Sequence, residues 1–212
     1  MSDLEQHMDK VRQHLTEKYA ARERALQSSR ETIRHSSNSI RAVHRGEFDR
    51  AESLIAQAGT CLAEARKVLI DHPDIFYAGF FQDAEKEYVE ANATYCVISD
   101  RPIPGQEELG ASDQAYLHGL GETVGELRRH LLDIIRRGER TRCEELLSTM
   151  EEIYGFLTTM DFPDGMTGGL RRTTDVARGI LEKTRGDLTM ALQQRDLEAR
   201  LEAFEQRLSQ RK

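Results

Sequence analysis

The sequence contains no tryptophan, and its aromatic residues amount to only 6% of 212 residues. It has just four prolines, and no stretch alternates apolar and polar residues in the way of a half-buried strand. Charged residues make up 32% of the chain. This composition favours helices over a β-sandwich or a β-barrel.

Cysteine is also scarce, and its pattern excludes two kinds of site. The three residues, Cys61, Cys96 and Cys143, are odd in number and show no CxxC spacing. They are typical of free thiols in a reducing compartment rather than of a disulfide framework or a structural zinc site. No charged segment followed by an apolar run opens the chain, and no stretch approaches ~18 apolar residues. We therefore expect a soluble, cytoplasmic protein with no membrane partner.

Two further absences limit the ligands. Neither GxxxxGK[ST] nor GxGxxG occurs, so nucleotide binding by those phosphate loops is excluded. The net charge of −7 argues against a uniformly basic nucleic-acid binder. A local basic stripe remains compatible with this charge.

The apolar residues recur at intervals of three, four and seven, which predicts amphipathic helices. Gly46 and Gly138 are expected to end two of them, and Ser112 is expected to cap the helix that follows a loop rich in proline and glycine. The predicted fold is all-α, with about six to seven helices in one domain of residues 1–212. The six long helices are expected at about residues 4–45, 47–70, 74–98, 112–137, 140–159 and 170–208.

Two of the predicted helices have a stripe of acidic side chains. Residues three or four apart share a helix face, so Glu87 lines up with Glu90. Glu122 and Glu126 line up in the same way on the next long helix. If these helices pack together, the four carboxylates form an oxygen-rich site suited to Mg²⁺ or Mn²⁺. A solvated face laced with ion pairs is the commoner origin of such stripes, and spacing leaves both interpretations open. Glu85 lies off the stripe, and its replacement is expected to do little.

A basic stripe follows the first predicted helix at spacings of four, seven and four residues. It consists of Arg30, Arg34, Arg41 and Arg45. Arginine forms bidentate contacts with phosphate, so an inward-facing stripe would hold a nucleic-acid backbone. Arg128 and Arg129, beside Glu126, are candidates for stabilising a scissile phosphate. The alternative interpretation of the stripe is a solvated face whose charge is balanced by Glu31 and Glu47. For Arg128 and Arg129 the alternative is a simple salt bridge.

Three segments resemble the translin family, and in particular its Trax-type (translin-associated factor X) subunits. "EYVEANATYCVI" (residues 87–98) is similar to the EYVEA helix of Trax, and "YLHGLGETVGELRR" (116–129) resembles the pattern YLxGxxDLTGELMR. "LRRTTDVARGILEKTRGDLTMAL" (170–192) is similar to the last helix of the family. The resemblance covers about residues 24–194, which leaves 195–212 as a helical C-terminal extension.

The resemblance implies a translin-like helical bundle, of archaeal or prokaryotic type, that assembles into a hollow homo-oligomeric barrel of eight subunits. Trax-type subunits resemble Mg²⁺-dependent endoribonucleases, and their acidic active-site residues fall here on Glu87, Glu90, Glu122 and Glu126. Glu122 stands where the family pattern has Asp, so this carboxylate reaches about one methylene further.

The resemblance thus implies an endoribonuclease that binds and cleaves single-stranded RNA with Mg²⁺, or with Mn²⁺, and that can also bind single-stranded DNA. The alternative is a translin-like protein that binds single-stranded RNA or DNA without cutting it. A helical scaffold with no nucleic-acid role is the third hypothesis, and only the composition favours it.

Overall fold

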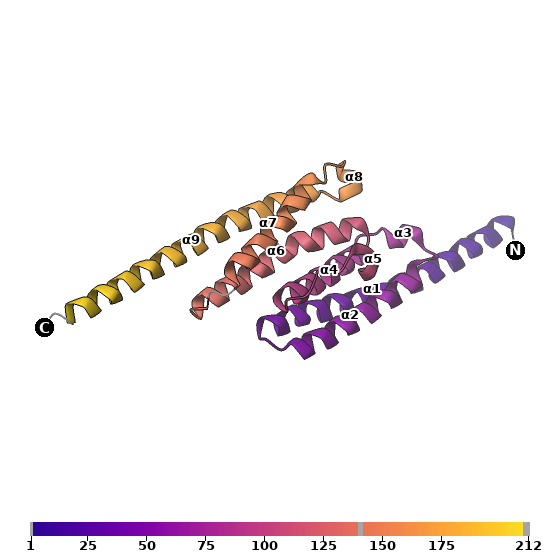
Figure 1. The fold of residues 1–212 in the computed structure, drawn as a ribbon. Coiled ribbons are helices and arrows are strands. Elements are labelled where there is room, and N and C mark those ends of the chain that lie inside the picture. The colour runs from indigo at the N-terminus through magenta and orange to yellow at the C-terminus, as the bar shows by residue number, and fades with distance from the viewer. Residues whose placement is uncertain (1, 140–141, 210–212) are drawn as a thin grey trace.

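A computed structural model describes residues 2–139 and 142–209, and six long helices form an elongated bundle (Figure 1). The described residues contain no strand, so the all-α prediction is confirmed. Ser112 caps the fourth long helix as expected, because its side chain accepts a hydrogen bond from the Ala115 amide. The long helices are α1 (Asp3–His44), α2 (Phe48–Leu69), α4 (Phe80–Ile98), α6 (Asp113–Arg136), α7 (Cys143–Thr159) and α9 (Leu170–Ser209).

Three single-turn helices interrupt the described loops, namely α3 (Pro73–Phe76), α5 (Gln106–Leu109) and α8 (Asp164–Thr167). The first of these corrects the sequence prediction, which joined α3 and α4 into one helix from residue 74. Gly79 separates them because its φ of +93° lies in the left-handed region. The start predicted for α7, near residue 140, lies outside the described residues.

Helix α4 is central, since it packs against α1, α2 and α6. Tyr95 is buried in the core, and Tyr88 is packed against the same core. From α6, the buried side chains of Val124, Leu127 and Leu131 join the same core. The acidic stripes of α4 and α6 are therefore attached to two helices that are fixed against each other.

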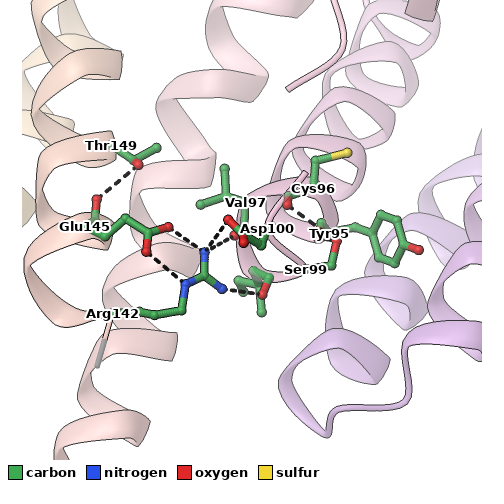
Figure 2. A network of polar contacts seen from close by, with 9 residues as sticks. Tyr95, Cys96, Val97, Ser99, Asp100, Arg142, Glu145 and Thr149 are labelled. Atoms are coloured by element: carbon green, nitrogen blue, oxygen red, sulfur yellow. Dashed lines mark hydrogen bonds and ion pairs between the residues drawn. The ribbon is translucent and has the colours of Figure 1, made fainter. Parts of the chain in front are cut away.

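Arg142, just before α7, holds the C-terminal end of α4 in place (Figure 2). Its guanidinium donates hydrogen bonds of 2.9 Å to the carbonyl oxygens of Val97 and Ile98. It also forms an ion pair of 2.6 Å with Glu145 and lies 3.6 Å from Asp100. These bonds give additional donors to carbonyl groups in the last turn of the helix, where the intrahelical hydrogen bonds run out. The link fixes α4, and with it the acidic residues further along that helix.

The two ends of the chain extend beyond the bundle at opposite ends of the molecule (Figure 1). Along α1, buried positions begin only at Ala21. The apolar stripe predicted for this helix is therefore exposed over its first part, at Leu4, Met8, Val11, Leu15 and Tyr19. Among the described residues, no helix combines the length and the apolar character needed to span a membrane.

Candidate metal centre

The acidic stripes meet because α4 and α6 approach each other closely at Gly119. A Cβ atom at this position would lie 2.7 Å from the Cβ of Val89 and 2.8 Å from the carbonyl oxygen of Lys86. Any side chain larger than hydrogen would therefore force the two helices apart. Glu122 lies one turn further along the same face of α6, so the contact at Gly119 brings its carboxylate towards α4.

Three of the four predicted carboxylates gather at one point. One oxygen from each of Glu87, Glu90 and Glu122 lies within 4.8 Å of the others. Glu90 is only 8% exposed, whereas the other two are half-buried. Clustered carboxylate oxygens are the type of ligand that Mg²⁺ and Mn²⁺ prefer. The residues therefore fit a divalent cation with hard oxygen ligands.

Glu90 is the most perturbed member of this group. Burial raises its pKa to about 8, and the negative charges of Glu87, Glu122 and Glu126 add to the effect. Burial also raises the pKa of Glu87. Without a cation, Glu90 therefore holds a proton at neutral pH, because ionising it would place like charges close together in a poorly solvated site.

Glu126 lies beside the three-carboxylate group rather than within it. Its Oε2 is 2.5 Å from Nε2 of His44 on α1. This hydrogen bond lowers the pKa of Glu126 although burial opposes the shift. Since an ionised carboxylate only accepts, Nε2 of His44 is the donor. The sequence predicted that Glu126 would join the same point as the other acids; the structure instead gives it a partner from a third helix.

His44 and Lys86 are the site residues that sequence reasoning missed. The His44 side chain is 5% exposed, and its buried Nδ1 has no hydrogen-bond partner among the described residues. A single histidine on a helix indicates no more than a structural or exposed side chain, and nothing in the sequence connects it with Glu126. Lys86 Nζ lies 2.8 Å from Glu122 Oε1 and 3.6 Å from Glu87 Oε1. Adjacent residues on a helix do not face each other, so helical spacing could not have suggested the contact with Glu87, and the contact with Glu122 comes from another helix.

The charge of Lys86 partly neutralises the acidic group. Burial by itself would lower the pKa of Lys86, but the hydrogen bond to Glu122 and the charges of Glu87 and Asp83 outweigh it and raise the pKa. Lys86 is therefore a cation at neutral pH. Its ammonium group lies against two of the three converging carboxylates, those of Glu87 and Glu122.

The expectation that Glu85 could be replaced freely is wrong. This residue is 1% exposed. Its Oε1 accepts a hydrogen bond of 2.8 Å from Arg66, and its Oε2 accepts one of 2.7 Å from the Ser112 hydroxyl. The expectation failed because α4 is covered on several sides, so a position off the acidic stripe still faces neighbouring helices. Removing this carboxylate would leave buried polar groups without partners.

The predicted basic stripe lies on the exposed face of α1. Arg30, Arg34, Arg41 and Arg45 are all exposed. Arg34 pairs with Glu31 and Arg45 with Glu47, as the solvated-face interpretation expects. Among the described residues, Arg30 and Arg41 form no ion pair with an acidic side chain.

Arg128 and Arg129 have different surroundings. Arg128 joins α6 to α9 through an ion pair of 2.7 Å with Asp187 and a hydrogen bond of 3.1 Å to Thr184. It therefore has a structural partner. Arg129 is largely exposed, with Nη1 3.6 Å from Glu126 Oε2. Of the two, Arg129 is the one next to the acidic residues.

The chain was compared with known protein families, curated proteins and solved structures. No family model matches it. The chain is 31% identical to the uncharacterized protein MJ0175 of Methanocaldococcus jannaschii. The alignment spans 199 residues and covers 93% of this chain and 88% of that protein.

The chain is also similar to solved structures. Two structures of AfC3PO each match with a TM-score of 0.81. One is described as a complex with duplex RNA and is 34% identical to this chain, and the other is a crystal structure of AfC3PO that is 35% identical. Each match covers 89% of this chain and 98% of that chain. The structure of apo-NeC3PO matches with a TM-score of 0.79 at 21% identity, over 87% of this chain and 96% of that one. This last likeness concerns the fold alone.

Proposed function

The chain belongs to the translin family, as do the C3PO proteins, and from this premise we propose that it is a Trax-type, metal-dependent endoribonuclease acting on single-stranded RNA. The observation on which the proposal depends is the convergence of Glu87, Glu90 and Glu122 from α4 and α6. Family membership supports RNA as the ligand, because one of the similar structures is an RNA complex. The carboxylates support hydrolysis rather than binding alone.

The proposed cofactor is Mg²⁺, with Mn²⁺ as a substitute, held by the three carboxylates. Bound there, the ion would polarise the scissile phosphate and lower the pKa of an attacking water. Glu90 must lose its proton to act as a ligand, since its pKa is about 8 in the absence of a cation. Lys86 would lose part of its contact with Glu122 and become free to pair with a phosphate oxygen.

Glu126 has a separate role in this proposal. Its lowered pKa keeps it ionised, and His44 fixes its orientation through the 2.5 Å hydrogen bond. A fixed carboxylate beside the metal ligands can position the attacking water by accepting a hydrogen bond from it. Arg129, exposed and 3.6 Å from Glu126, is placed to contact the charge that develops on the phosphate.

A binding protein without nuclease activity is the second candidate, and one contact favours it. The Lys86 ammonium already lies 2.8 Å from Glu122, so an internal cation compensates part of the acidic charge. Glu122 also replaces the Asp of the family pattern. In this alternative the acidic group is a structural ion-pair network, and RNA is held without being cut.

The experiment that separates the two candidates is incubation of the purified protein with end-labelled RNA. Single-stranded and duplex RNA of the same sequence are compared, each with Mg²⁺ and with EDTA. We expect shorter products from the single strand with Mg²⁺ and intact RNA with EDTA. Binding of RNA without products under any of these conditions would favour the second candidate.

The basic stripe on α1 is the proposed contact for the RNA backbone. Replacing Arg30, Arg34 and Arg41 together with alanine should weaken RNA binding for every sequence, because phosphate contacts read no bases. Each lost contact should reduce the slope of log K against log[salt] by roughly 0.7 for a single strand. Fluorescence anisotropy with labelled RNA at several salt concentrations measures both effects.

The control for this variant removes the same charge from another exposed helix face. Arg171, Arg178 and Arg185 on α9 are exposed and can be replaced with alanine in the same way. If both triple variants change the salt slope equally, net charge rather than the α1 stripe determines binding. An unchanged slope in the α1 variant would mean that the stripe only faces solvent.

The proposal includes assembly into a closed homo-oligomer, for which the family resemblance implies eight subunits. The exposed apolar side chains at both ends of the chain support association, because monomers seldom leave such rows uncovered. Binding of single-stranded DNA in the same way belongs to the proposal as well.

A further inference from the structure

Lys86 places a positive charge among the carboxylates that the proposed function assigns to a metal. Its ammonium nitrogen lies 2.8 Å from Glu122 Oε1 and 3.6 Å from Glu87 Oε1. The side chain is 23% exposed, so water solvates it only in part. Clustered carboxylates without a cation repel one another. While no metal is bound, Lys86 therefore acts as the counter-ion of the site.

A divalent cation on the same carboxylates would come too close to this ammonium for both to stay. Mg²⁺ binds carboxylate oxygens at about 2.1 Å. An ion on Glu122 Oε1 would thus lie within about 5 Å of the Lys86 nitrogen, because that nitrogen is itself 2.8 Å from the same oxygen. Two positive charges at this separation repel strongly in a poorly solvated site. Lys86 must then leave Glu122 and turn away from the metal.

An alternative partner for the ammonium lies one turn earlier on α4. Asp83 precedes Lys86 by three residues, so the two side chains share a helix face. Asp83 is exposed, and exposed ion pairs contribute little because water screens them. In the protein without RNA, Asp83 therefore offsets only a small part of the cost of breaking the contact with Glu122.

An RNA phosphate offers the displaced ammonium a stronger partner, since it brings a full negative charge into a half-buried site. We propose that Lys86 couples the metal to the RNA: it competes with the divalent cation until RNA binds and then pairs with a phosphate oxygen. The cation should therefore bind more tightly when RNA is present, and RNA should gain the same factor from the cation. The inference rests on the proposed function, because it requires that the carboxylates hold a metal and that RNA reaches them.

A permanent ion pair is the competing interpretation of the same distances. In that case Lys86 keeps its contact with Glu122 whether or not a cation is present, as expected for a protein that binds RNA without cutting it. The two interpretations differ in where the ammonium lies after the metal has been added. The decisive experiment therefore follows the amine of Lys86 rather than RNA cleavage.

Amine acetylation of the full-length parent chain follows this group directly. A brief pulse of N-hydroxysuccinimidyl acetate is applied with EDTA, with saturating Mg²⁺, and with Mg²⁺ plus a single-stranded 2′-O-methyl RNA, which nucleases cut poorly. Mass spectrometry of the digested protein gives the acetylation rate at each lysine. Lys67, which is exposed on α2, is the control within the same sample.

We expect Lys86 to react slowly with EDTA, severalfold faster with Mg²⁺, and slowly again when RNA is added. The metal frees the amine from Glu122, and the phosphate then covers it. Lys67 should react at the same rate with EDTA and with Mg²⁺. An unchanged Lys86 rate at saturating Mg²⁺ would show a permanent ion pair and overturn the proposal. So would a Lys86 amine that stays reactive after RNA has bound.

Titration calorimetry measures the coupling itself. For the parent chain, RNA should lower the Kd of Mg²⁺ by roughly 5-fold or more. Lys86→Met removes the charge, so this variant should bind Mg²⁺ more tightly than the parent without RNA and should gain less from RNA. Lys67→Met removes the same charge elsewhere and should behave like the parent. A Lys86→Met variant with the parental Kd and the parental gain would mean that Lys86 plays no part in the coupling. Circular dichroism confirms that both variants are folded.

The calorimetry also separates this inference from the proposed function. A parent chain that binds no Mg²⁺, with or without RNA, would remove the proposed metal site and the inference together. A parent chain that binds Mg²⁺ while the acetylation rate of Lys86 stays constant would leave the metal site in place and remove only the coupling.

Discussion

Replacing Glu90 with glutamine is expected to slow Mg²⁺-dependent RNA cleavage by a factor of ~10² or more, while RNA binding is retained. The amide keeps the size of the side chain but cannot supply the negative oxygen that a metal ligand needs. Glu90 is the most buried of the three converging carboxylates, so solvent cannot easily replace the lost ligand. Single-turnover cleavage of labelled RNA and anisotropy binding measure the two quantities separately.

The control for this prediction is Glu144→Gln, the same chemical change on an exposed position of α7. It should cleave at the parental rate. Glu85 is unsuitable as a control, because its buried ion pair with Arg66 makes a loss of folding possible. Parental cleavage by the Glu90 variant would mean that the acidic group is not the catalytic centre.

The metal-free protein is expected to lose stability as the pH rises from about 4.5 to about 8. Burial raises the pKa of Glu90 from 4.5 to about 8 in the folded state, whereas the unfolded chain releases this proton near 4.5. Between these values the folded state holds more protons than the unfolded state. Raising the pH therefore favours unfolding, and the stability that protonated Glu90 contributes is fully lost above about pH 8.

Mg²⁺ should reverse this loss, since it binds only the folded, deprotonated site. At a free concentration of 100 times Kd the ion would stabilise the fold by about 2.7 kcal/mol, which raises Tm by roughly 5–10 °C for a chain of this size. Thermal melts with EDTA and with Mg²⁺ at pH 6 and pH 8.5 measure both effects.

The Glu90→Gln variant serves as the comparison in these melts. Glutamine does not titrate, so the Tm of the metal-free variant should depend less on pH than that of the parent. Mg²⁺ should also raise the Tm of the variant by less. A parental protein whose Tm does not respond to Mg²⁺ at pH 8.5 would contradict a metal site at these carboxylates. Glu144→Gln should behave like the parent.

The periodicity of the sequence predicted most of the fold, because six long apolar stripes leave few alternatives to helices. It failed where one backbone conformation decides the outcome. The apolar residues on either side of Gly79 continue a helical rhythm, but the positive φ of this glycine ends it. Periodicity describes which side chains share a face and contains no information about such a break.

The candidate site was predictable as far as residues on the same helix are concerned. Glu87 and Glu90 share a face by spacing alone, and Glu122 joins them because Gly119 allows close packing. The partner of Glu126 was not predictable, since His44 comes from a helix far away in the sequence. Nor was the burial of Glu85, which depends on how many helices surround α4.

The contact between His44 and Glu126 joins residues 82 positions apart in the sequence. Contacts between residues so far apart in the sequence form more slowly than the local contacts within a helix. A partly folded chain in which α1 has not yet docked therefore has its converging carboxylates but no anchor for Glu126. We expect the proposed nuclease to reach full activity only once α1 has docked and His44 holds Glu126.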